Sequence, residues 1–163
     1  MPPPPLPSPE LDKFLRAVRK SGLLPAARVD ALVNEAPQTS ARNPDKLGEF
    51  FVERGVLTHF QVTKLKQGTF QGLVLGPYHI LSPLGKGGMG TVYLAHDTRR
   101  PEGRQALVAL KVLPPKRARE ENRMLARFQR EMDLAQRVGH PHLTKTFDAV
   151  SYTHLTLPTI LRV

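Results

Sequence analysis

The hydrophobic pattern of this chain changes its period near Leu73, and that change constrains the fold more than any other feature. Residues 10–68 carry apolar side chains at the spacing of α-helices, whereas short β-branched and apolar runs of strand length follow them. A chain of 163 residues accommodates one domain or two small ones with modest cores. We therefore expect an α+β protein in which a helical module over residues 10–70 precedes a separate sheet domain over 75–149.

The helical module contains an internal repeat. Residues 22–32 align with residues 55–65, at an offset of 33 residues, and each copy follows a helical stretch. In each copy one helix ends at a glycine, Gly22 or Gly55, because glycine tolerates the left-handed cap conformation. Two helical hairpins packed as a small bundle satisfy this pattern. Their apolar stripes consist of Leu11, Phe14, Leu15 and Val18 and of Leu57, Phe60, Val62 and Leu65.

The helix starts and the flanking segments can also be predicted. Pro25 suits the first turn of a helix, and Thr58 with Gln61 forms a capping-box pattern. Residues 37–44 are expected to be a polar linker, and the proline-rich leader over residues 1–9 is expected to be disordered. The module has no clustered histidines, carboxylate pair or glycine loop, so we interpret it as an interaction or spacing module.

The sheet domain is expected to contain four strands and one helix. A polar hairpin over residues 96–105 joins the second strand to the third. The strand-like runs cover residues 78–84, 91–95, 106–113 and 143–150, and the helix covers residues 119–138. The predicted buried stripe of that helix consists of Leu125, Phe128, Met132, Ala135 and Val138.

The chain is strongly basic, with a formal net charge of +10 and a pI near 10.4. The net charge is +3 up to residue 75 and +7 beyond it. No aromatic residues alternate with the basic ones as a base-stacking platform requires, so a solvated helix face is favoured over a phosphate-binding stripe, and no nucleic-acid partner is expected. The excess is concentrated at Lys116, Arg117, Arg119, Arg123, Arg127, Arg130 and Arg137.

Composition excludes several classes of protein. The absence of cysteine excludes a disulfide scaffold, cysteine-ligated zinc, an iron–sulfur cluster and a thiol nucleophile. No apolar run reaches the ~18–20 residues of a membrane-spanning helix, and the first ten residues lack the features of a signal peptide. We therefore expect a cytoplasmic protein without a membrane segment.

A glycine cluster with the arrangement G-x-G-x-x-G-x-V separates the first two strands. Glycines at this spacing let a hairpin fold closely over a polyphosphate and present backbone N–H groups to it, although a hairpin turn without ligand explains them as well. A Rossmann loop would open into a helix, and a P-loop would place a lysine where Gly90 precedes Thr91. The residues of the cluster are Leu84, Gly85, Lys86, Gly87, Gly88, Met89, Gly90, Thr91 and Val92.

Two further motifs follow the glycine cluster in order. Residues 108–111, Val-Ala-Leu-Lys, end an apolar strand at Lys111, and Glu131 lies beside the apolar stripe of the helix, where it would be poorly solvated without a cationic partner. With the glycine cluster these residues resemble the small lobe of the protein kinase family. Residues 128–131 and 139–143 are similar to the helix and following turn of bacterial serine/threonine kinases in particular. The helical repeat ahead of the lobe resembles N-terminal segments of some planctomycete-type bacterial kinases.

The resemblance, which spans about residues 75–149, implies a kinase small lobe made of an antiparallel β-sheet and the family's C-helix. It implies that the glycine loop covers the phosphates of ATP and that Lys111 contacts the α- and β-phosphates while Glu131 holds Lys111 in place. The residues that would enclose adenine are Leu84, Val92 and Ala109.

The family's H-R-D catalytic loop and its D-F-G motif do not occur in the sequence. The resemblance therefore implies that the large lobe is absent, that the chain holds neither a catalytic residue nor a metal ligand, and that it is inactive by itself. In the full-length kinase we expect ATP, Mg²⁺ and protein substrates. A non-catalytic helical interaction module with a pseudokinase-like lobe is the alternative.

Residues 150–163 resemble the translation of an adapter used in transposase-based sequencing libraries, both in their sequence and in the position at which that translation stops. We expect them to be an adapter-derived tail that has no part in the function.

Overall fold

The computed structural model describes residues 8–87, 90–112, 146–149 and 159–162, together with residues 123, 126, 127, 130, 131, 133, 134 and 137. The chain divides into two compact units, Met1–Val74 and Leu75–Val163. The boundary lies next to the position at which the hydrophobic period changes. Within the described part of the chain, no helix combines the length and the apolar character needed to cross a bilayer.

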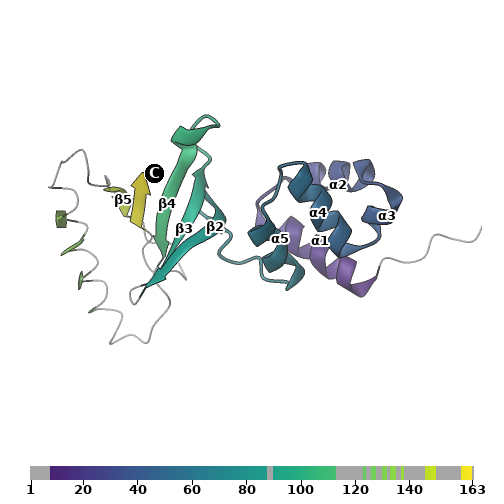
Figure 1. The fold of residues 1–163 in the computed structure, drawn as a ribbon, viewed down its shortest axis with the longest axis horizontal. Coiled ribbons are helices and arrows are strands. Elements are labelled where there is room, and N and C mark those ends of the chain that lie inside the picture. The colour runs from purple at the N-terminus through teal and green to yellow at the C-terminus, as the bar shows by residue number, and fades with distance from the viewer. Residues whose placement is uncertain are drawn as a thin grey trace, which may run out of the picture. The chain divides into compact units, whose positions relative to one another are not determined.

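The first unit is helical (Figure 1). It consists of α1 (Pro9–Ser21), α2 (Ala26–Glu35), α3 (Gln38–Ala41), α4 (Pro44–Glu53) and α5 (His59–Lys66). The pairs α1/α2 and α4/α5 are the two predicted hairpins. The segment predicted to be a polar linker between the hairpins contains α3, a one-turn helix between the prolines that precede α3 and begin α4. The sequence analysis did not predict this turn, although proline is compatible with a helix start as well as with a linker.

The capping residues set the bounds of these helices. Gly22 has φ of 75° at the end of α1, and Gly55 follows α4 with φ of 67°, as the cap patterns predict. At α5 the Thr58 side chain accepts from the Gln61 amide, and the Gln61 side chain accepts from the Thr58 amide, which completes the capping box. Pro25 lies just before α2 in an extended conformation rather than in its first turn.

The apolar stripes of both hairpins meet in one core. The rings of Phe14 and Phe51 lie 6.1 Å apart between α1 and α4. Helices α4 and α5 approach closely at Gly48, where an added Cβ would lie 2.5 Å from Cγ1 of Val62. The fully buried side chains of this core are Phe14, Val18, Val29, Leu32, Leu47, Phe51 and Leu65. The predicted stripe residues Leu15 and Phe60 are only partly buried at its edge.

The second unit contains a six-stranded sheet with the order β1-β2-β3-β4-β6-β5, part of which is labelled in Figure 1. Its strands are β1 (Val74–Leu75), β2 (Tyr78–Gly87), β3 (Gly90–Asp97), β4 (Leu107–Val112), β5 (Thr146–Ala149) and β6 (Thr159–Arg162). The pairs β2/β3, β3/β4, β4/β6 and β5/β6 are antiparallel. Four of the strands match the predicted runs, and β6 lies in the segment expected to be an adapter-derived tail. The predicted buried stripe of the helix lies outside the described residues.

The register of the sheet separates its two faces. Ala95 pairs with Val108 and Val92 pairs with Lys111, so alternate residues point to opposite faces. One face is apolar and buried, through Tyr78, Ile80, Ala95, Val108 and Leu110. The other face carries Lys111.

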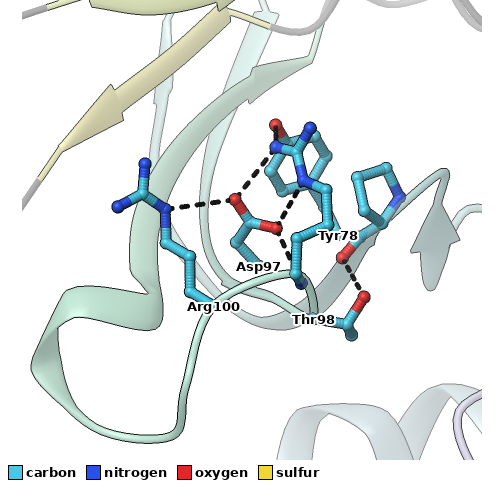
Figure 2. Close-up of polar contacts among 6 residues, drawn as sticks. Tyr78, Asp97, Thr98 and Arg100 are labelled. Atoms are coloured by element: carbon cyan, nitrogen blue, oxygen red, sulfur yellow. Dashed lines mark hydrogen bonds and ion pairs between the residues drawn. The ribbon is translucent and has the colours of Figure 1, made fainter.

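A polar network joins the end of β3 and the first residues of the following turn to the start of β2 (Figure 2). The Asp97 side chain is only 4% exposed, and Arg99 donates to its two oxygens from Nε and Nη2 at 2.9 Å each. Arg99 also donates to the Tyr78 hydroxyl and lies over the Tyr78 ring at 5.2 Å. Arg100 reaches the second Asp97 oxygen at 3.4 Å, and Thr98 donates to the Pro77 carbonyl. Hydrogen bonds from Arg99 hold the pKa of Asp97 below its ordinary value, against the opposing effect of burial.

A cross-strand pair of histidines lies on the opposite face of the β2/β3 pair from Tyr78 and Asp97. His79 of β2 pairs with His96 of β3. Burial, and then the positive charge of His96, lower the pKa of His79. This part of the sheet therefore contains a carboxylate, Asp97, that favours its charged form and an imidazole, His79, that resists protonation.

We predict that Asp97→Ala lowers the free energy of unfolding of the sheet unit by about 1–3 kcal/mol, because both arginines lose their common carboxylate partner. Denaturant unfolding followed by a probe in this unit measures the loss. Arg100→Gln is the matched control, and it should cost less than about 1 kcal/mol because it removes a single, longer contact and leaves the hydrogen bonds from Arg99 in place. Equal losses in the two variants would contradict the assigned role of Asp97.

We also predict that acid destabilises the sheet unit through His79. Its pKa in the folded chain lies below the unfolded value of 6.5, so protonation favours unfolding. The stability is complete above the unfolded value and is lost as the pH falls from there through the folded pKa. Unfolding measured from about pH 7.5 to about pH 5 should show a smaller decrease in His79→Gln than in the unmodified chain, and an equal decrease in the two would contradict the role of His79.

Candidate functional site

The glycine cluster forms the hairpin between β2 and β3. Gly85 pairs with Val92, Lys86 pairs with Thr91, and Gly87 pairs with Gly90. Gly90 has φ of 134°, a conformation that side chains rarely adopt, so the fold itself requires this glycine. Two register shifts, at Ile80/Ser82 and Pro83/Gly85, interrupt the ladder before the turn. Gly88 and Met89, which belong to the predicted site, lie outside the described residues.

Neither the backbone conformation nor the packing of the described residues requires glycine at positions 85 and 87. Neither Gly85 nor Gly87 adopts a positive φ. A Cβ built on either residue meets no atom within 4 Å, and both positions are exposed. In strands glycine is disfavoured, because it loses more conformational entropy on folding than other residues. These two positions therefore keep the backbone accessible at a cost in stability.

Lys111 and Glu131 form an ion pair. Lys111 Nζ donates to Glu131 Oε2 at 3.2 Å, from the end of β4 to a helical residue twenty positions later. The Lys111 side chain is 22% exposed and that of Glu131 is 51% exposed. The expected cationic partner of Glu131 is thus present, and the Glu131 side chain is at the same time half exposed to solvent.

The three residues expected to enclose adenine lie on the strands around Lys111. Val92 stands directly opposite Lys111 across the β3/β4 ladder, and Ala109 lies two residues before it on the same face. Leu84 lies at the second register shift and is 55% exposed. The structure thus brings Val92, Ala109 and Lys111 to one face, next to the glycine hairpin.

Leu94 lies on the same face of the sheet, but it was not predicted from the sequence as a residue of the site. It pairs with Ala109 across the ladder and follows Val92 by two residues. The period-two alternation of a strand could have identified it once Val92 was chosen. Among the described residues, no group of three or more acidic or histidine side chains could hold a metal ion. The site can therefore bind a polyanion through backbone amides and Lys111, but these residues supply no metal centre.

Comparison with known proteins gives three findings. Residues 78–160 match the family described as protein tyrosine and serine/threonine kinase. Serine/threonine-protein kinase PknD of Mycobacterium tuberculosis is 44% identical over 78 residues, which are 47% of this chain and 11% of PknD. Probable serine/threonine-protein kinase PkwA of Thermomonospora curvata is 44% identical over 75 residues, which are 46% of this chain and 9% of PkwA.

A solved structure is also similar. The crystal structure of the M. tuberculosis PknI kinase domain is 32% identical, with a TM-score of 0.41, over 56% of this chain and 34% of that domain. The chain spans about a tenth of the length of the two curated relatives named above. The family match covers half of the chain and contains every residue of the candidate site, so this chain belongs to the protein tyrosine and serine/threonine kinase family.

Proposed function

We propose that the sheet unit is the ATP-binding portion of a serine/threonine protein kinase, which transfers the γ-phosphoryl group of ATP to protein hydroxyls. The two curated relatives named above are serine/threonine kinases by name, which favours this substrate class over tyrosine. The alternative of a non-catalytic interaction module receives no support from these relatives.

The observation that carries the proposal is the pair of glycines at 85 and 87. Backbone strain and packing both fail to explain them, so a ligand outside the chain is the remaining reason for the missing side chains. A phosphate chain against this hairpin accepts hydrogen bonds from backbone N–H groups, which only a bare backbone can approach closely. Gly90, by contrast, is accounted for by its positive φ.

Lys111 is the cation of the proposed site. Its ammonium group contacts the α- and β-phosphates and neutralises part of their charge. Glu131 orients Lys111 through the observed ion pair. Because Glu131 is half exposed, its ion pair with Lys111 is weak. The Lys111 ammonium can therefore replace its contact with the Glu131 carboxylate by a contact with a phosphate.

The apolar side chains next to Lys111 form the proposed adenine contact. Val92 and Ala109 lie on the Lys111 face of the sheet, and Leu84 presents an exposed side chain beside the glycine hairpin. Contact with a flat base removes apolar surface from water and stabilises the bound nucleotide.

Magnesium does not fit the residues of this chain. The family holds Mg²⁺ with the D-F-G aspartate and the catalytic-loop asparagine, and neither motif occurs in the sequence. The described residues provide no substitute cluster. We therefore assign nucleotide contacts alone to this chain, and for the whole kinase we propose Mg²⁺ with ligands from outside these 163 residues.

We predict that Gly85→Ala and Gly87→Ala weaken ATP binding without destabilising the fold. The added methyl group stands between the phosphates and the backbone amides, so the dissociation constant should rise by about tenfold or more. NMR titration with ATP measures binding, which we expect to be weak even in the unmodified chain, and thermal unfolding measures stability.

Gly103→Ala is the matched control for this experiment. Gly103 also has open space around its Cβ position, but its φ of 124° makes alanine strained. It should lower the stability by about 1 kcal/mol and leave ATP binding unchanged. A loss of stability in Gly85→Ala or Gly87→Ala that accounts for the weaker binding would overturn the proposed phosphate contact.

We predict that the 163-residue chain transfers no phosphate. Phosphoryl transfer requires a positioned nucleophile and neutralised charge around the metal-bound nucleotide, and this chain contributes only the phosphate contacts. The assay combines the purified chain, ATP, Mg²⁺ or Mn²⁺ and a basic protein substrate. Incorporation that Lys111→Met abolishes would contradict the prediction, and activity after addition of a kinase large lobe is the positive control.

A further inference from the structure

The helix that carries Glu131 has a face that the nucleotide site does not use. All eight described residues between positions 123 and 137 are helical and exposed. Arg123, Arg127, Arg130, Leu134 and Arg137 recur at alternating intervals of four and three residues. An α-helix brings residues at this spacing onto one face. We call these five residues the arginine stripe.

The arginine stripe concentrates positive charge around an exposed apolar residue. Within the described part of the chain, none of its four guanidinium groups has an ion-pair partner. Leu134 is 63% exposed, and only one other large apolar side chain, Leu84 of the candidate site, is described as exposed. A solvated helix face has no need of an exposed leucine among its arginines.

We propose that the arginine stripe is a docking surface for an acidic polypeptide segment with an apolar residue at its centre. Guanidinium groups pair with carboxylates in a bidentate geometry, and Leu134 supplies the apolar contact between them. The stripe extends over about 21 Å, the rise of fourteen helical residues, which a short acidic segment can cover. This proposal concerns a partner of the helix and does not depend on nucleotide binding.

The composition of the stripe favours polypeptide over nucleic acid. The described residues 123–137 include no aromatic side chain on which a base could stack. An exposed leucine among arginines, by contrast, matches the apolar contacts of a protein interface.

The test is a binding titration with the full 163-residue chain. The probe is a fluorescein-labelled peptide of about 20 residues with glutamates around one central leucine, a length matched to the stripe. Fluorescence anisotropy at low salt should show binding. Arg123→Gln/Arg130→Gln should weaken it by about five- to tenfold, because two exposed charge contacts are lost.

Matched variants separate the stripe from the net charge of the chain. Arg42→Gln/Arg104→Gln removes two exposed arginines outside the stripe and should leave binding unchanged. Leu134→Ser should weaken binding of this peptide but not of a peptide whose central leucine is serine. Circular dichroism should show the same helix content in all variants.

Three outcomes would overturn the proposal. Equal weakening by the two double arginine variants would assign binding to net charge alone. An unchanged affinity in Leu134→Ser would remove the apolar contact. Tighter binding of a DNA duplex of about 20 base pairs, with a steeper salt dependence and the same sensitivity to Arg123→Gln/Arg130→Gln, would identify the stripe as a nucleic-acid surface.

Discussion

The register of β3 against β4 is the constraint on which the candidate site depends. Because side chains alternate between the faces of a strand, a slip by one residue would move Lys111 to the apolar face and Leu110 to the site. The buried pair of Ala95 and Val108 opposes such a slip. A slip would expose these apolar side chains to water and would bury the charge of Lys111. The same packing that stabilises the lobe therefore places Lys111 opposite Val92.

The ion pairs at Asp97 and at Lys111 differ in how far they are exposed to solvent. The Asp97 carboxylate is almost completely buried, receives hydrogen bonds from the side chain and the amide of Arg99, and forms a longer ion pair with Arg100. Removing one partner from such a network is costly, so it holds a fixed geometry. The ion pair between Lys111 and Glu131 lies closer to solvent, because the Lys111 side chain is 22% exposed and the Glu131 side chain is 51% exposed. Water can compete for such a pair, so its geometry is less fixed than that of the Asp97 network.

Local signals made much of the fold predictable. The capping box at Thr58, the glycine caps and the strand runs depend on neighbours within a few residues, and the structure confirms them. The exposure of Glu131 and the pairing of β6 with β4 depend on contacts between distant segments, for which a single sequence has no pattern. The association of Lys111 with Glu131 was expected only through the resemblance to kinases. Leu94 was not predicted because the G-x-G-x-x-G-x-V motif specifies Val92 but not the residue two positions after it.

The closed base of the turn between β3 and β4 has a consequence for how the lobe can acquire new sequence. The ladder pair of His96 and Leu107 joins the two sides of the turn, Asp97 and Arg99 fix its β3 side against Tyr78, and residues 101–103 beyond them are exposed. An insertion at this tip lengthens a loop whose ends are already fixed, and each doubling of loop length costs only about 0.6 kcal/mol. Natural insertions and engineered reporter domains can both be accommodated here without disturbing the pairing of the two strands.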